Sequence, residues 1–197
     1  MTTQHSASQA SIKLIIVGTS GVGKTSLIAS FFHRKFDINP NQTVAPAFCG
    51  ANIQIDNNMT VDLQIWDTAG QEQYQSISQM FYRDAKVAFV CYERANEEYV
   101  TQWVSRVRNN VPECNIILIT TKSDTLTQDE VIEEKVNSKK IADIVQASSH
   151  FVTSAKTGES VQEAFHAAAK YAKGGPQHET RMQKLDLDQE NNKNSCC

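Results

Sequence analysis

Hydrophobic positions along the chain form short apolar runs that alternate with longer stretches of mixed polarity. The runs at 12–17, 86–92, 115–121 and 150–153 are typical of strands buried in a parallel sheet. The intervening stretches at 25–32, 96–110, 129–146 and 160–173 have the length and spacing of helices. This alternation predicts an α/β fold, a mostly parallel sheet with helices on both faces.

One pair of runs has a different pattern. Apolar Val61, Leu63 and Ile65 alternate with polar residues within 59–67, and the turn-forming segment 56–58 separates this run from another at 48–55. Such a pair predicts an antiparallel hairpin. The preceding segment, 36–46, contains two prolines and predicts a loop.

The start of the last helix carries a capping signal. Ser160 and Glu163 have the spacing of a capping box, which predicts that the helix begins at Ser160.

A glycine-rich loop follows the first apolar run. Residues 18–25 fit G-x-x-x-x-G-K-[ST], and a strand before the loop with a helix after it is the context in which this pattern binds phosphates. Glycines let successive N–H groups turn toward a phosphate, Lys24 supplies positive charge, and the Thr25 hydroxyl can ligate Mg²⁺. The alternative is a glycine-rich turn that binds nothing.

Bulk properties narrow the class of protein. A chain of 197 residues is long enough for one domain with at most a tail. Its net charge is −3 and it has no Lys/Arg cluster, so nucleic acid is not an expected partner. Residues 1–11 are polar, and Thr2 stands where N-myristoylation needs Gly. We therefore expect synthesis in the cytosol, with Cys49, Cys91 and Cys114 as core thiols.

Four segments in order resemble the motif set of the Ras-superfamily GTPases: 18–25, 67–72, 121–124 and 154–156. Trp66, the stretch 71–77, the stretch 81–83 and the final Cys196-Cys197 resemble the Rab branch in particular. The likeness spans 12–173 and implies a P-loop NTPase small G domain. Its sheet would have six strands with one antiparallel edge hairpin, and it would bind GTP or GDP.

The resemblance implies roles at the phosphate end of the site. The phosphates would be held by the loop and the start of its helix: Ser20, Gly21, Val22, Gly23, Lys24, Thr25 and Ser26. Thr25 and Thr43 would ligate Mg²⁺, and Asp67 would hold the ion through water. Gly70 would donate its N–H to the γ-phosphate. Gln71 would be the catalytic residue that orients the attacking water.

At the base end, Asp124 would accept hydrogen bonds from the ring N–H and exocyclic amine of guanine. Lys122 and Phe36 would pack along the base, and Ser154, Ala155 and Lys156 would offer backbone N–H groups. Thr121 departs from the family, which usually has Asn there. We expect the shorter hydroxyl to weaken nucleotide binding. The alternatives are a core aromatic for Phe36 and a turn acid or helix cap for Asp124.

Phe48, Trp66 and Phe81 match the aromatic triad that effectors contact in the Rab branch, although core packing is an equal alternative for Trp66 and Phe81. Ala45 and Ala47 are atypical of that branch, so the effector-facing strand is expected to be unusual. Ala47 together with the stretch 80–83 faintly resembles the endocytic branch.

Residues 174–197 are polar and begin with Gly-Gly-Pro, which predicts a disordered tail. The polar segment 1–11 likewise predicts a disordered N-terminus. The final Cys196 and Cys197 resemble a doubly geranylgeranylated end, and two chains anchor where one is marginal. The alternative is a tail without lipids.

Together these features predict a monomeric GTPase switch on the cytoplasmic face of a vesicle or endosome that cycles with the cytosol. It would be slow alone and served by an exchange factor, an activating protein (GAP), effectors and an escort or GDI-type prenyl chaperone. One alternative is a module of the same fold that exchanges nucleotide quickly and hydrolyses little. An ATP-using P-loop enzyme is a third possibility, which Asp124 opposes.

Overall fold

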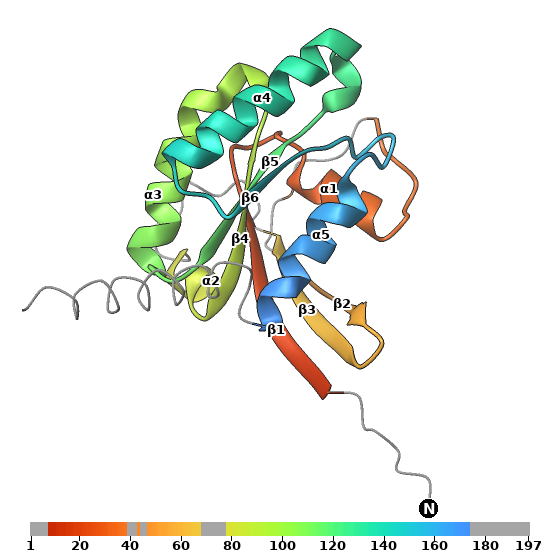
Figure 1. The fold of residues 1–197 in the computed structure, drawn as a ribbon, viewed down its shortest axis with the longest axis vertical. Coiled ribbons are helices and arrows are strands. Elements are labelled where there is room, and N and C mark those ends of the chain that lie inside the picture. Colours follow the sequence, from red (N-terminus) through yellow and green to blue (C-terminus); the bar gives the residue numbers. More distant parts are fainter. Residues whose placement is uncertain (1–7, 39–42, 44–46, 68–77, 174–197) are drawn as a thin grey trace, which may run out of the picture.

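Six strands form one sheet in the order β2-β3-β1-β4-β5-β6 (Figure 1). The structure is a computed structural model, and it describes residues 8–38, 43, 47–67 and 78–173. The strands are β1 (Ser8–Val17), β2 (Ala47–Asp56), β3 (Met59–Asp67), β4 (Ala85–Tyr92), β5 (Asn115–Thr120) and β6 (Ser149–Val152). Only β2 and β3 pair in antiparallel fashion within this described sheet. The predicted parallel sheet with one antiparallel edge hairpin is confirmed.

Helices cover the sheet from both sides, as predicted (Figure 1). They are α1 (Lys24–Phe31), α2 (Ser78–Tyr82), α3 (Val100–Asn110), α4 (Gln128–Ile144) and α5 (Val161–Lys170), with 3₁₀ turns η1 (Arg94–Tyr99), η2 (Ser123–Thr125) and η3 (Tyr171–Lys173). Successive β1 side chains serve opposite cores: Leu14 and Ile16 pack with α1 and α5, whereas Ile15 and Val17 pack with α3 and α4. The strand's period of two therefore builds both layers at once.

The N-terminal strand is longer than the sequence predicts. It begins at Ser8, so residues 8–11, assigned above to an unstructured N-terminus, belong to β1. Their backbone pairs in parallel with the start of β3, with Ser8 opposite Met59. The Ser11 hydroxyl also donates to the Asp62 carboxylate at 3.1 Å. The sequence of residues 8–11 gives no apolar pattern that would predict a strand, because this part of β1 is stabilised by backbone pairing with β3.

The predicted capping box at Ser160 is wrong. Ser160 has a left-handed backbone with φ of 55° and makes no capping hydrogen bond with its side chain. A complete box instead starts α4: Thr127 Oγ1 accepts from the Glu130 N–H at 3.3 Å, and Glu130 Oε2 accepts from the Thr127 N–H at 2.8 Å. The Thr-x-x-Glu spacing of these residues was the available signal.

The topology brings the predicted motifs to one edge of the sheet. The glycine loop follows β1, Asp67 ends β3, Thr121 follows β5 and Ser154 lies just beyond β6. Carboxyl ends of parallel strands form the usual ligand edge of such folds. At Gly18, any Cβ would lie 2.2 Å from the Cys91 carbonyl oxygen, so the loop can leave the sheet here only with glycine.

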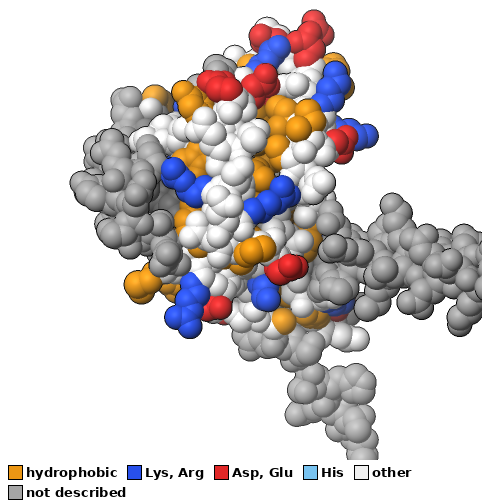
Figure 2. Space-filling model, turned by 90° about the vertical axis from the view of Figure 1, so that its left-hand side faces the viewer, with side chains coloured by type: hydrophobic (Ala, Val, Ile, Leu, Met, Phe, Trp, Pro, Cys, Tyr) orange, Lys and Arg blue, Asp and Glu red, His pale blue; other side chains and the backbone are white. Residues whose placement is uncertain are grey.

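The surface on the α3 side carries hydrophobic side chains in separate small groups among Lys and Arg, with acidic side chains gathered toward its upper end (Figure 2). None of the described helices combines the length and hydrophobicity needed to cross a bilayer. The predicted motif residues that the structure describes lie at the carboxyl edge of the sheet rather than on this surface.

Candidate nucleotide-binding site

A cavity of about 680 Å³ opens at the carboxyl edge of the sheet. That volume suits a small-molecule ligand. Most of the predicted binding residues line it: Ser20, Gly21, Gly23, Lys24, Thr25, Ser26, Phe36, Thr43, Thr121, Lys122, Asp124, Ala155 and Lys156. Residues that the sequence interpretation missed also line it: Leu27, Asp37, Ile38, Thr125 and Thr153.

The glycine loop wraps one end of the cavity. Gly21 and Gly23 have φ of 77° and 101°, in the region that favours glycine. Lys24 begins α1, is 5% exposed, and donates from Nζ to the carbonyls of Gly18 at 2.7 Å and Thr19 at 2.9 Å. The loop thus holds a positive charge beside the N-terminus of α1, and a helix N-terminus is a suitable place for an anion.

Three oxygen-bearing side chains from separate segments meet beside this loop. The Thr25 hydroxyl donates to Asp67 Oδ2 at 2.6 Å, and the Thr43 hydroxyl lies 2.7 Å from that of Thr25. Asp67 is 2% exposed, and its Oδ1 is buried without a hydrogen-bond partner among the described residues. An orphaned carboxylate oxygen next to two hydroxyls suits a hard divalent cation such as Mg²⁺.

Asp67 carries the electrostatic signature of such a place. Burial raises the pKa of its carboxyl above the ordinary value, while the Thr25 hydrogen bond and the Lys24 charge act in the opposite direction. A bound cation would offset the free-energy cost of burying this carboxylate in its charged form. Thr25, Thr43 and Asp67 therefore have the chemistry to hold one.

The end of the cavity where the base is expected is organised around Asp124 in η2. Its Oδ1 accepts from the Ser154 hydroxyl at 2.7 Å, and Lys156 Nζ lies 3.9 Å from Oδ2. Ser154 Oγ in turn accepts from the N–H groups of Lys156 at 3.2 Å and Thr157 at 3.1 Å. Ser154 itself is buried and does not line the cavity; it orients the carboxylate that does.

Thr121 links the two ends of the cavity. Its hydroxyl donates to the Val22 carbonyl in the glycine loop at 2.7 Å and lies 3.2 Å from the Tyr92 carbonyl. Val22 is fully buried, so it contributes this carbonyl rather than a cavity surface. The short side chain at 121 therefore does reach the glycine loop, but a single O–H offers no second donor of the kind an amide has.

Lys122 is held from the side by a residue that the sequence interpretation missed. Its Nζ lies 2.7 Å from Glu93 Oε1, and its backbone is left-handed with φ of 60°. Glu93 directly follows β4 at the ligand edge, which was the available signal. Phe36 borders the same cavity and is 37% exposed.

An aromatic cluster lies at the β2–β3 side of the molecule. The ring centroids of Phe48 and Trp66 are 5.2 Å apart, and those of Trp66 and Phe81 are 5.8 Å apart. Phe48 is exposed, whereas Trp66 is half-buried and packs partly against the core. Lys13 Nζ lies 4.3 Å over the Trp66 ring and donates to the Met80 and Arg83 carbonyls, so it ties α2 to the sheet.

Several predicted site residues lie outside the described part of the chain. They are Ala45, Gly70, Gln71, Cys196 and Cys197.

The chain matches known proteins over most of its length. A family model described as "Ras family" matches residues 13–173. The chain is 38% identical over 161 residues to "GTP-binding protein ypt5" of Schizosaccharomyces pombe, covering 80% of this chain and 76% of the relative. It is 32% identical to "Ras-related protein Rab-5B" of Plasmodium falciparum, with 84% and 80% covered. It is 35% identical to "Ras-related protein RabQ" of Dictyostelium discoideum, with 81% and 78% covered.

Proposed function

Because the chain belongs to the Rab group of the Ras family of small GTPases, we propose that its switch works through the residues around this cavity. Like its family, the protein binds guanine nucleotides, hydrolyses GTP to GDP and phosphate, and regulates vesicle trafficking through regulators and effectors. Phosphate binding, hydrolysis and base selection would each depend on a separate set of residues. The alternative of a module that exchanges nucleotide quickly and hydrolyses little has no better support.

The observation that carries the assignment is the meeting of Thr25, Thr43 and Asp67 beside the glycine loop. These residues would hold Mg²⁺, which when bound neutralises charge on the phosphate oxygens. Lys24 would turn its ammonium group from loop carbonyls to the outer phosphates. The α1 N-terminus would add N–H donors to the same anion.

Hydrolysis would depend on the segment after Asp67. Gly70 would donate its N–H to the γ-phosphate, and Gln71 would orient the attacking water. Loss of the γ-phosphate would release both this segment and the Thr43 segment, so the product of the reaction is a change of conformation.

Base selection would rest on Asp124, which Ser154 orients at 2.7 Å. Two carboxylate oxygens can accept from the ring N–H and the exocyclic amine of guanine, which adenine does not present together. Lys122 and Phe36 would pack along the base. Ala155 would offer its N–H group to the base oxygen. The N–H groups of Ser154 and Lys156, expected to do the same, already donate to the Glu159 carbonyl and to Ser154 Oγ.

We further propose an arrangement around the switch. Residues 8–173 would form the domain, and the tail 174–197 would carry lipids on Cys196 and Cys197 that hold the protein on the cytoplasmic face of an endosomal membrane. An escort or GDI-type chaperone would cover the lipids during cycling. Replacing both cysteines by Ser should leave the protein in the soluble fraction of a cell lysate, and persistence on membranes would contradict the lipid anchor.

Effectors would bind the aromatic cluster of Phe48, Trp66 and Phe81 in the GTP state, with the protein acting as a monomer. An exchange factor would open the cavity. A GAP would bring an arginine in trans, since Arg34 lies before the loop 36–46 that carries Thr43 rather than in it.

The test is single-turnover GTP hydrolysis and GDP release on one purified sample with Mg²⁺. Gln71→Leu should abolish hydrolysis, Gln75→Leu in the same segment should not, and ATP should fail to compete. Fast GDP release without hydrolysis in the unmodified protein would favour the exchange module instead. ATP competition would contradict the role of Asp124.

A further inference from the structure

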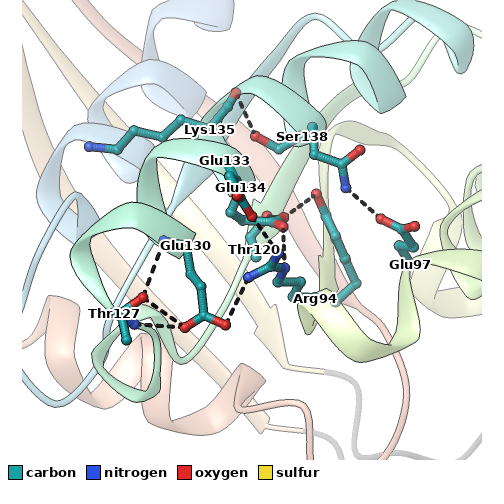
Figure 3. Close-up of polar contacts among 11 residues, drawn as sticks. Arg94, Glu97, Thr120, Thr127, Glu130, Glu133, Glu134, Lys135 and Ser138 are labelled. Carbon is teal, nitrogen blue, oxygen red and sulfur yellow. Dashed lines mark hydrogen bonds and ion pairs between the residues drawn. The ribbon is translucent and has the colours of Figure 1, made fainter.

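A fully buried carboxylate lies behind the base end of the cavity, on α4. Glu134 has a side chain with 0% exposure, and its Oε1 accepts from the Thr120 hydroxyl at 3.0 Å and the Tyr92 hydroxyl at 3.3 Å. Figure 3 shows Glu134 reaching from the helix toward Thr120 and Arg94. Its Oε2 has no hydrogen-bond partner among the described residues, and Arg94 Nε lies 3.9 Å from it.

Helix packing alone does not require this residue. Position 134 falls on the buried stripe of α4 with Ser138 and Ala142, where an apolar side chain would pack without the cost of burying a charge. Burial raises the pKa of the Glu134 carboxyl; the hydroxyls of Thr120 and Tyr92 and the Arg94 charge lower it, and Glu97 raises it further. The carboxylate is therefore kept against a desolvation penalty.

Both hydroxyls that Glu134 binds belong to residues that hold the base loop through their main chains. The Tyr92 carbonyl accepts from the Thr121 N–H at 2.9 Å. The Thr120 carbonyl accepts from the Thr153 N–H at 2.7 Å, and the Thr153 carbonyl accepts from the Ser123 N–H at 3.0 Å. One carboxylate oxygen thus fixes the ends of β4 and β5, and the loop 121–124 is attached to these ends.

Arg94 contacts the helix that carries Glu134. It lies 3.2 Å from Glu130 and 2.8 Å from Glu133, one turn or less from Glu134 on the exposed side of α4 (Figure 3). These exposed ion pairs connect η1 to α4 but contribute little to stability. The strand ends are held by the Glu134 hydrogen bonds themselves.

We propose that Glu134 is a positioning residue for guanine recognition, holding the ends of β4 and β5 so that Asp124 meets the base. This role rests on the function proposed above. Its removal loosens the loop 121–124, which speeds release of guanine nucleotide and weakens the preference for the exocyclic amine that Asp124 accepts.

The experiment measures release of GDP and of inosine diphosphate (IDP), which lacks that amine, from the Mg²⁺-loaded protein. Glu134→Met keeps the volume but orphans the two buried hydroxyls, and it should raise the GDP release rate by roughly tenfold. It should also bring the ratio of the IDP release rate to the GDP release rate closer to one. Glu134→Gln should restore both values toward wild type, because an amide oxygen accepts the same two hydrogen bonds.

Glu133→Met is the matched control, since Glu133 is an exposed acid on the same helix that contacts the same arginine. It should leave both release rates within about twofold of wild type. Should Glu134→Met fail to fold, Thr120→Val removes one of the two hydrogen bonds with little change of shape and should give the same pattern with a smaller, severalfold effect.

Equal acceleration of GDP and IDP, or no acceleration, would overturn the positioning role while leaving the nucleotide site intact. If instead the wild-type protein releases GDP and IDP at the same rate, the assignment of Asp124 under the proposed function fails first. The two failures are therefore distinguishable in one data set.

Discussion

The phosphate end and the base end of the cavity are built in different ways. The phosphate end is centred on one continuous segment, the glycine loop and the first residues of α1, and Thr25 of this segment contacts Asp67 at the end of β3 at 2.6 Å. The base end depends on longer side chains that other elements hold in place, with Glu93 beside Lys122 and Glu134 behind the loop. Local sequence therefore specifies the glycine loop and Lys24 of the first end, whereas tertiary packing specifies most of the second. We expect changes at the phosphate end to act on affinity for any nucleotide and changes at the base end to act on selectivity and release.

The largest effect should follow a change at the phosphate end. Lys24→Met removes the charge that would face the outer phosphates, and loss of such charged hydrogen bonds should weaken binding of GDP and GTP by roughly 100-fold. Equilibrium titration with a fluorescent nucleotide measures this. Lys86→Met, an exposed lysine on β4, is the control. A loss confined to GTP would mean that Lys24 contacts only the γ-phosphate.

A change of base preference should come next. Asp124→Asn replaces one accepting oxygen by a donor, which suits xanthine because it carries an oxygen where guanine carries the amine. The ratio of affinities for xanthosine and guanosine diphosphate should rise by about 100-fold in competition binding. Asp129→Asn, at an exposed acid of α4, should leave the ratio unchanged. An unchanged ratio in Asp124→Asn would place base selection elsewhere.

Thr121 tests the contact between the two ends. Thr121→Val removes the hydroxyl that donates to Val22 at 2.7 Å and should speed GDP release severalfold, about the effect of one buried hydrogen bond. Thr121→Asn should slow release by a similar factor, because an amide has a second donor for the nucleotide. Stopped-flow release measures both. Equal rates for Thr121→Asn and wild type would contradict the weakening that we assign to the threonine.

The smallest effect concerns stability and pH. The pKa of Glu134 is raised in the folded protein, so the stabilisation from its proton is present at low pH and is lost as pH rises through the folded pKa. The side chain of Glu134→Gln does not titrate. The melting temperature of this variant minus that of wild type should therefore increase by about 3 °C when the pH is raised from about 4.5 to about 7.5. Calorimetry at the two pH values measures the gain. A difference that is constant with pH would contradict the raised pKa.

The sequence predicts the order of elements and the place of the glycine loop between β1 and α1 well, because both depend on short-range patterns. The apolar runs mark the central strands, and 18–25 carries its own chemistry. Contacts across the chain escaped prediction: Thr121 and Val22 lie 99 residues apart, and Tyr92 and Glu134 lie 42 apart. A glutamate within a helix full of acids is expected to be solvated until packing places it inside. The strand at 8–11 escaped for the same reason, since its partner is β3.

The chain enters and leaves the described domain on the side away from the nucleotide cavity. Ser8 pairs with Met59 at the start of β3, and Lys173, the last described residue, forms an ion pair with Asp56 at the end of β2. Domains whose ends are neighbours tolerate circular permutation. A short linker could therefore join residues 8 and 173, and new termini could be opened in an exposed turn. A reporter fused to these termini would give a nucleotide sensor whose fusion sites are chosen independently of the nucleotide cavity.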